Sequence, residues 1–239
     1  MKLSIIYQDN DIVVVNKPAG ISVHKGVAEK GKTLADWLVE KFPEIKMVGD
    51  LPADRQVSNL RPGIVHRLDK DTSGVLVAAR NQKSFEFLKN QFQKREVVKK
   101  YLALVEGNLK NDNGVIALPI GRSASDFRKK LASDSAKGEL REAITEYKVL
   151  ERFPNYTLVE AYPKTGRTHQ IRAHFKAIGH PIVCDSLYGG KIMTCPFGLA
   201  RHFLHANFLE FVSPSGASLK LEADLPEDLA EVLAGLRKK

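Results

Sequence analysis

The sequence contains only two cysteines in 239 residues, Cys184 and Cys195, and no CxxC pair. Two cysteines do not make a disulfide framework, which is consistent with a reducing compartment. No stretch approaches the roughly 18 uninterrupted apolar residues of a membrane-spanning helix. Asp9, Asn10 and Asp11 interrupt the N-terminal apolar run, so the layout of a signal peptide is missing. The sequence therefore predicts a cytoplasmic protein that has no membrane partner.

Glycine-rich nucleotide-binding patterns are also missing, because the chain has neither GxGxxG nor a P-loop. His169, His174 and His180 lie close together, but the i, i+4 spacing of a helical zinc site does not occur among them. His169 and His174 are five residues apart, which is about 140° beyond one helical turn. They therefore do not share a ligand face, and the sequence predicts neither a metal nor any other cofactor.

Acidic residues are fewer than basic ones, with 28 Asp and Glu against 37 Lys and Arg, so the net charge is +9. A basic balance favours a polyanionic partner, because each phosphate that the protein neutralises releases counterions. Charge alone does not decide between a nucleic acid and no such partner. The length fits one large domain or two lobes, with enough chain to bury a sizeable core.

Apolar spacing predicts both strands and helices. Two hairpins are expected, over residues 3–16 and 143–162. A capping box at Thr33 and Asp36 begins a helix that Pro43 ends. A capping acid at Asp224 is expected to begin the last helix. Other elements expected are helices at about 81–95 and 168–178, and strands at 74–79, 97–105, 203–211 and 218–221.

Residues 61–74, RPGIVHRLDKDTSG, form the most distinctive stretch. Turn-forming pairs, Pro62-Gly63 and Ser73-Gly74, bound it, and the apolar run GVLVAA follows directly. Two acids, Asp69 and Asp71, lie there among cations. This pattern predicts a loop carried on a rigid strand, and loops of that kind often hold chemistry.

The segment HRLDKDTSG, residues 66–74, closely resembles the signature of the RluA-type pseudouridine synthases, which isomerise uridine to pseudouridine in RNA. KYLALVEG at 100–107 resembles the second motif of that family, and TGRTHQIRAH at 165–174 resembles the third. FLHA at 203–206 is a weaker fourth match. The resemblance extends from about residue 5 to about residue 224.

The resemblance implies the fold of these enzymes, an α/β (α+β) architecture. A mixed, mostly antiparallel sheet would be flanked by helices, and an active-site cleft would cross its middle. Residues 1–239 would then form a single catalytic domain with two sublobes. Many relatives carry an additional N-terminal RNA-binding module, and no separate module of that kind is expected here.

The reaction breaks a glycosidic bond, rotates the uracil and forms a carbon–carbon bond. It has no net redox change and needs no cofactor, but it does need a carboxylate near the sugar and base. The resemblance assigns this role to Asp69. The carboxylate would attack the base, attack the sugar or remove a sugar proton, and one sequence does not choose among these routes. Asp71 is interpreted as a turn residue that acts with Thr72 and Ser73.

Two more catalytic roles follow from the resemblance. Tyr101 would lie against the uracil, because a tyrosine ring offers a flat face and a polar tip. Arg172 would lie beside Asp69, where its guanidinium fork fits a carboxylate. Without the resemblance, Tyr101 is simply a half-buried strand residue.

Substrate contacts are expected from five residues. Arg67 would fill the gap that a flipped base leaves in the RNA, although it could instead contact a phosphate. His66 is expected to contact the RNA beside it. Lys164 and Arg167 lie near the start of an expected helix and suit phosphate binding. Leu204 would pack near the base, or would simply belong to the core.

Two regions depart from simple expectations. Relatives usually have glycine where Cys184 stands, which weakens any claim that this position needs a positive φ. Residues 121–142 have few apolar side chains and many cations. They predict a mobile basic excursion without a core, either a flap over RNA or a solvated loop.

The predicted function is that of an RNA pseudouridine synthase acting on ribosomal or transfer RNA, with Asp69 essential. The alternative from another class is a non-catalytic RNA-binding or RNA-chaperone protein that uses the same basic surface. A hydrolase resembling a glycosidase is a third interpretation, and it would need a second positioned carboxylate. Nothing in the sequence indicates a dimer, so a monomer is the default.

Overall fold

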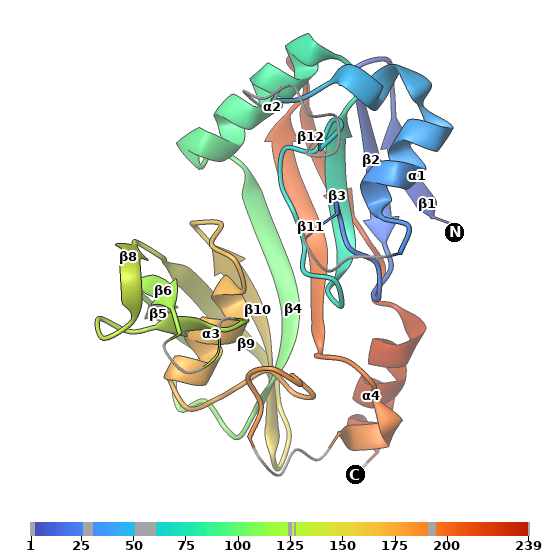
Figure 1. Cartoon of the computed structure of the whole chain (residues 1–239). Coiled ribbons are helices and arrows are strands. Elements are labelled where there is room, and N and C mark those ends of the chain that lie inside the picture. Colours follow the sequence, from blue (N-terminus) through green and yellow to red (C-terminus); the bar gives the residue numbers. More distant parts are fainter. Residues whose placement is uncertain are drawn as a thin grey trace. The chain divides into compact units, whose positions relative to one another are not determined.

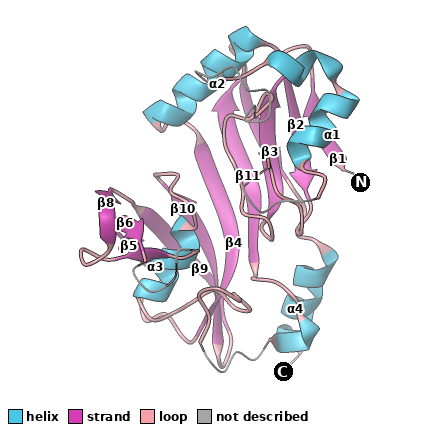
Figure 2. Cartoon of the chain, in the orientation of Figure 1, coloured by secondary structure: helices cyan, strands magenta, loops and turns pink. Residues whose placement is uncertain are grey.

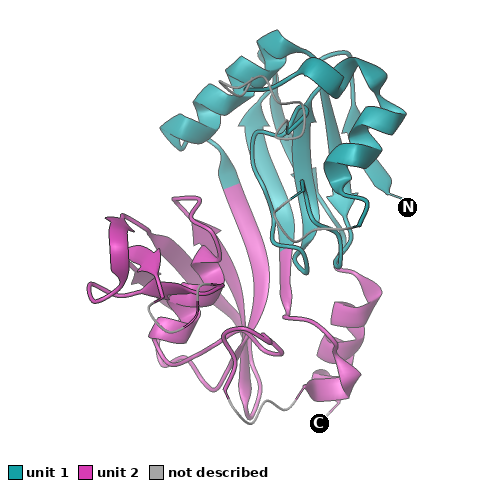
Figure 3. Cartoon of the chain, viewed as in Figure 1, with its two compact units in different colours: residues 1–98, 206–224 teal, residues 99–205, 225–239 magenta. Residues whose placement is uncertain are grey.

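The computed structural model describes residues 3–25, 31–50, 61–123, 126, 128–190 and 195–238. The chain divides into two compact units (Figure 3). Unit 1 contains Met1–Val98 and Ala206–Asp224, and unit 2 contains Lys99–His205 and Leu225–Lys239. Within the described residues, no helix is both long and apolar enough to cross a membrane.

The elements are shown in Figures 1 and 2. The helices are α1 (Leu34–Lys41), α2 (Gln82–Lys94), α3 (Gln170–Ala177) and α4 (Glu227–Arg237), with short 3-10 turns η1 (Pro43–Met47) and η3 (Pro196–Gly198). The strands are β1 (Ser4–Gln8), β2 (Ile12–Lys17), β3 (Ser73–Ala79), β4 (Val98–Glu106), β5 (Asn113–Ile116), β6 (Ile120–Arg122), β7 (Lys130–Ala132), β8 (Lys137–Arg141), β9 (Thr145–Arg152), β10 (Tyr156–Pro163), β11 (Leu204–Val212) and β12 (Ser218–Glu222).

Unit 1 is built on an antiparallel meander in which β2 lies between β1 and β3, and β12 pairs with β11. Every residue of β3 is buried, so both faces of that strand are covered. The amphipathic helix α2 places Phe85 and Leu88 against one face. Burying each of these side chains contributes about 1.5–3 kcal/mol. The expected first hairpin and the helix at 81–95 are both confirmed.

Local signals set the ends of the unit 1 helices. The Thr33 hydroxyl accepts from the Asp36 N–H and the Asp36 carboxylate accepts from the Thr33 N–H, so the predicted capping box is present. Pro43 follows the end of α1, as expected. At α2 the side chain of Asn81 accepts from the Ser84 N–H.

In unit 2 the strands pair antiparallel in the order β4-β10-β9-β5. Alternate residues of β4 and β10 belong to two different cores. One core packs under α3, and the other packs under α4 through Leu229, Val232, Leu233 and Leu236. The sheet therefore lies between two helices, as the period-two alternation of a strand with two buried faces requires. The predicted class, an α/β fold with a mostly antiparallel sheet and flanking helices, is confirmed.

The expectation for residues 121–142 is wrong in the described part of that segment. Strands β7, β6 and β8 form a three-stranded antiparallel sheet in that order. A small core forms beneath it from Ile120, Ala132, Ala143, Ala173 and Tyr188. Most of these apolar groups lie outside 121–142, so the composition of the segment did not show them. Residues 124, 125 and 127 lie outside the described part.

Two further details differ from expectation. Pro226, not Asp224, is the N-cap of α4, and no side chain caps its backbone. Cys184 and Cys195 are joined in a disulfide, with Cα atoms 5.3 Å apart. This separation is normal for a disulfide, and the cysteine count did not predict the bond.

Gly74, the second residue of β3, has φ +122°, and a Cβ atom there would clash with the Ala206 backbone. We expect Gly74→Ala to lower the free energy of unfolding by about 2–4 kcal/mol, because backbone strain and overpacking add. Thermal or denaturant unfolding measures this loss.

Gly216→Ala is the matched control in the same unit. Gly216 has φ +90° but open space around its Cα. Gly216→Ala should lower the free energy of unfolding by about 1 kcal/mol, through backbone strain alone. Equal losses at the two positions would contradict the role assigned to the Ala206 contact.

Candidate active site

The loop that carries Asp69 is held by backbone contacts within unit 1. Gly63 donates its N–H to the Val48 carbonyl at 2.9 Å and accepts the Ala79 N–H at 2.8 Å. Its φ is +67°, and a Cβ atom there would clash with the Ala79 carbonyl. Only glycine fits this close approach, so the Pro-Gly turn predicted from the sequence has a structural reason.

His66 helps to support this loop. Its Nε2 accepts the Val77 N–H at 3.1 Å. Its ring stacks on Phe92, with ring centroids 4.6 Å apart. These contacts join the loop to β3 and α2. The expected contact between His66 and RNA stays a prediction.

Lys17 supports the same loop and was missed by sequence reasoning. Its side chain is fully buried, and its Nζ donates to the carbonyls of Pro18, Ile21 and Lys70 at 2.8–2.9 Å. A buried ammonium is tolerated only when its donors are satisfied. The Lys70 carbonyl belongs to the residue after Asp69, so Lys17 fixes the backbone beside the predicted catalytic carboxylate.

Alternation along the loop separates core from surface. Leu68 is buried, Asp69 is half-buried and Arg67 is exposed. The Thr72 N–H donates to the Asp69 carbonyl at 3.2 Å and closes a turn. Arg67 Nη1 lies 3.4 Å from His24 Nε2. Burial, followed by the charges of two nearby arginines including Arg67, lowers the pKa of His24 to about 4, so this ring is neutral beside the guanidinium at neutral pH.

Tyr101 and Leu204 lie in one cluster of unit 2. Tyr101 is half-buried on β4 opposite Ala161, and it packs on the same core as Ala103 and Val105. Leu204 is buried, at 3% exposure, in that core. The structure therefore brings Tyr101 and Leu204 together.

Arg172 projects from α3 into a buried ion pair with Asp185. Its Nε donates to Asp185 Oδ2 at 2.6 Å, and its Nη2 donates to Oδ1 at 2.8 Å. The two side chains are 7% and 0% exposed. This fork uses two of the five N–H donors of the guanidinium. Sequence reasoning predicted a carboxylate fork for Arg172 but did not find Asp185.

Asp185 also organises the turn that follows it. Its Oδ1 accepts the N–H groups of Leu187 and Tyr188, both at 3.0 Å. Burial raises the pKa of Asp185, but the hydrogen bonds and charge of Arg172, with smaller contributions from His202 and the Tyr188 N–H, outweigh it. The pKa therefore lies below its usual value, and the carboxylate stays charged.

Cys184, which precedes Asp185, has φ +59°. The expectation that this position does not need a positive φ is wrong. The left-handed conformation costs a non-glycine residue roughly 1–2 kcal/mol, and here it aims the next side chain at α3.

Arg167 and Lys164 both have partners in unit 2. Arg167 Nε donates to the Glu142 carbonyl, and its backbone N–H donates to Gln170 Oε1, each at 3.0 Å. Lys164 forms an exposed ion pair with Glu146 at 2.9 Å. Exposed pairs of this kind are weak and break easily. Phosphate binding by either residue stays a prediction.

His174 is a structural residue that is fully buried. Its Nε2 donates to the Leu118 carbonyl and its Nδ1 accepts from the Thr145 hydroxyl, both at 2.9 Å. Burial lowers its pKa, although the Leu118 hydrogen bond opposes this. Among the described residues, no three His, Cys, Asp or Glu side chains are gathered as metal ligands.

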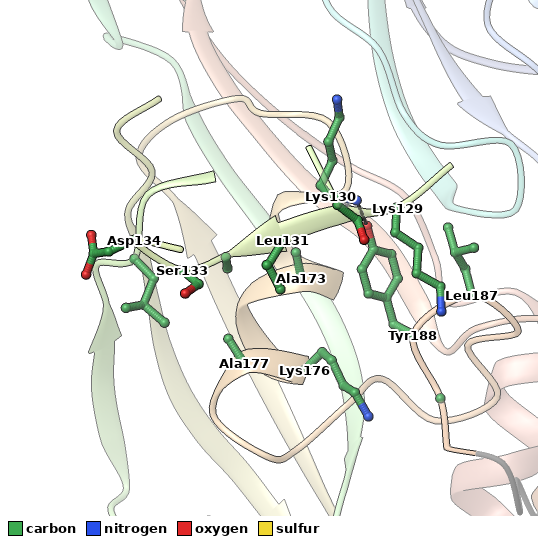
Figure 4. A pocket seen from close by; sticks show the side chains of 14 residues that line it. Lys129, Lys130, Leu131, Ser133, Asp134, Ala173, Lys176, Ala177, Leu187 and Tyr188 are labelled. Carbon is green, nitrogen blue, oxygen red and sulfur yellow. Dashed lines mark hydrogen bonds between the residues drawn. The ribbon is translucent and has the colours of Figure 1, made fainter. Parts of the chain in front are cut away.

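A pocket of about 580 Å³ lies between α3 and β7 in unit 2 (Figure 4). Ala173 and Ala177 of α3 and Leu131 of β7 give it an apolar lining, and lysines lie around it. Tyr188 also lines it, and its hydroxyl accepts the Lys130 N–H at 2.8 Å.

The predicted site residues fall into two sets. Asp69, His66 and Arg67 belong to unit 1. Tyr101, Lys164, Arg167, Arg172 and Leu204 belong to unit 2. Within each unit the structure fixes how these side chains are held. A site and a cleft formed by both sets stay predictions.

Comparison with known proteins decides the family. Residues 11–177 match the model of the RNA pseudouridylate synthase family, and this range includes the Asp69 loop and the helix that carries Arg172. The chain belongs to this family. It is therefore an RNA pseudouridine synthase, an isomerase that converts uridine in RNA to pseudouridine.

Relatives of the same family match this chain over its full length. An uncharacterised RNA pseudouridine synthase of Bacillus subtilis is 41% identical over 100% of this chain and 74% of its own length. The ribosomal large subunit pseudouridine synthase D of Pseudomonas aeruginosa is 38% identical over 100% of this chain and 73% of its own length. The solved structure of human RNA pseudouridylate synthase domain containing 1 has a TM-score of 0.74 at 27% identity, covering 100% of this chain and 96% of that one.

The pH dependence of stability follows from His174. Its pKa in the folded synthase lies below the ordinary value of 6.5, so protonation favours the unfolded chain. The stability of the neutral ring is fully present above pH 6.5 and is lost as pH falls toward the lowered pKa. We expect the melting temperature of the synthase to fall on acidification, and to fall less in His174→Gln. Gln can repeat both hydrogen bonds without a titrating ring, so an equal fall in both proteins would exclude His174 as the cause.

Asp185→Asn should lower the free energy of unfolding by about 3–5 kcal/mol, because it leaves the Arg172 charge buried without its counter-ion. Denaturant unfolding measures the loss. Adding Arg172→Met should recover part of it. Glu139→Gln removes one partner of an exposed pair with Arg141 and should leave the unfolding transition unchanged. If Asp185→Asn alone unfolds at the same denaturant concentration as the parent enzyme, the stabilising role assigned to the buried pair is wrong.

Proposed function

We propose that this synthase modifies uridine in the RNA of the large ribosomal subunit, with Asp69 as the essential carboxylate. The proposal of substrate rests on relatives named ribosomal large subunit pseudouridine synthase D, which are 34–39% identical over nearly the whole chain. The proposal for Asp69 rests on its place in the signature loop. Close backbone contacts at Gly63 and Gly74 and the buried Lys17 fix the backbone of that loop.

Asp69 supplies the carboxylate that the bond exchange needs, by attack on base or sugar or by removing a sugar proton. It is half-buried, so it is accessible to a flipped nucleotide while its backbone stays fixed. Preorganisation of this kind lowers the cost of reaching the reactive geometry.

Arg172 serves Asp69 as a hydrogen-bonding cation. Because Asp185 balances its charge within unit 2, Arg172 is stable in its buried position before any substrate arrives. In this role Arg172 orients a second carboxylate with N–H donors other than the two that bind Asp185. In this assignment Asp185 fixes the guanidinium in place, and the Asp69 carboxylate accepts hydrogen bonds from it.

The remaining roles concern the RNA. Tyr101 lies against the uracil, with Leu204 in the core that supports it. Arg67, which is exposed, fills the gap left by the flipped base, and His66 contacts the RNA beside it. Lys164 and Arg167 contact phosphates. The enzyme works as a monomer in the cytoplasm.

Asp69→Asn should bind RNA with the affinity of the parent enzyme but form no pseudouridine, since the amide keeps the shape and loses the nucleophile. A purified assay on large-subunit RNA, with pseudouridine read by mass spectrometry, measures this. Asp71→Asn, two residues away in the same loop, is the matched control and should stay active. Turnover by Asp69→Asn would falsify the assignment.

Mapping pseudouridines in cells with and without the gene tests the substrate. Sites in the large-subunit RNA should disappear and return when the gene is restored. Loss confined to transfer RNA would overturn the ribosomal assignment and leave the enzyme class intact.

A further inference from the structure

Tyr188 lies where the Asp185 turn, α3 and the three-stranded sheet meet. It is 4% exposed, and its ring belongs to the small core of Ile120, Ala132, Ala143 and Ala173. No motif in the sequence singled it out. Its contacts nevertheless lead directly to Arg172.

The guanidinium of Arg172 is fixed in two independent ways. Asp185 binds one edge through Nε and Nη2, which sets the direction of the fork within its plane. The central carbon of the guanidinium lies over the ring of Tyr188, 5.1 Å from the ring centroid. A fork alone permits the plane to tilt about the axis of the ion pair, whereas a ring packed against the cation limits that tilt.

The hydroxyl of Tyr188 holds the ring in its turn. It accepts the Lys130 N–H of β7 at 2.8 Å and lies 3.0 Å from His169 Nδ1. The His169 ring also meets the tyrosine ring edge-on, with centroids 5.7 Å apart. A buried tyrosine hydroxyl usually has one hydrogen-bond partner. This one lies within hydrogen-bonding distance of both a strand and the residue that precedes α3.

We propose that Tyr188 is a positioning residue for the reaction, whose ring sets the plane of the Arg172 guanidinium and whose hydroxyl ties that plane to the three-stranded sheet. The inference rests on the proposed function, in which Arg172 orients Asp69. A tilted guanidinium still pairs with Asp185 but aims its other donors away from the reacting carboxylate. The cost then falls on the chemical step and not on RNA binding.

Two variants separate the ring from the hydroxyl. Tyr188→Leu removes the stacking face and should lower kcat by about 10–100-fold with KM nearly unchanged. Tyr188→Phe keeps the face, releases the anchor and should lose less, by a few-fold. Tyr156→Phe, a change in the core that packs under α4, is the matched control and should react as fast as the parent enzyme. Parent-like kcat in Tyr188→Leu would overturn the proposal. If Tyr188→Leu does not fold, Tyr188→Phe tests the hydroxyl anchor, and parent-like kcat in that variant would overturn the proposal.

A double-mutant cycle separates positioning from general damage. Arg172→Lys removes the planar fork, so Tyr188→Leu should cause little additional loss of kcat in that background. If the loss of kcat in the double variant equals the product of the two single losses, Tyr188 acts independently of Arg172. That result would contradict the inference.

A spectroscopic readout makes the failure of the inference distinguishable from that of the proposed function. The ¹⁵N–¹H signal of Arg172 Nε–H is identified by its loss in Arg172→Lys. In the parent enzyme its proton should exchange slowly with solvent. It should shift or broaden in Tyr188→Leu and stay unchanged in Tyr156→Phe. An unaltered signal in Tyr188→Leu would reject the positioning role even if the enzyme is active. An altered signal in an enzyme that forms no pseudouridine would instead place the failure in the proposed function.

Discussion

The ion pair between Arg172 and Asp185 is the interaction on which the rest of unit 2 depends. Two charges taken out of water gain little net stability, because desolvation offsets their attraction. What the pair does provide is direction. The carboxylate fixes the edge of the guanidinium, accepts two N–H groups of the turn that contains Tyr188, and stays ionised. Helix α3, the turn and the three-stranded sheet are therefore organised around one buried arginine.

Much of the fold was predictable, because its signals are local. The capping box at Thr33, the cap at Asn81 and the turn at Gly63 each involve residues that are near in sequence or need a special backbone angle. The small sheet over 120–141 was not predictable. Its strands are short and polar, and Tyr188 and Ala173, distant in the chain, supply much of its core. Apolar periodicity cannot show a core that one segment borrows from another.

The predicted site residues were found by resemblance, and their supporting residues by structure alone. Asp185 is thirteen residues from Arg172, so no helical or strand spacing joins them. In the sequence, Lys17 directly follows the first expected hairpin and carries no signal of burial. In the structure its ammonium donates to three backbone carbonyls of unit 1. Each is a buried charge, and pairing of buried charges is decided by tertiary contacts. Cys184 gave no signal either, because a cysteine does not indicate the left-handed backbone angle that aims Asp185.

The bond from Lys130 to Tyr188 comes from the main chain and not from a side chain. Any residue except proline could therefore occupy position 130 and still make it. Outward-facing side chains of the small sheet can therefore change without loss of this hydrogen bond. Variation on the surface of the sheet is uncoupled from the geometry of the interior.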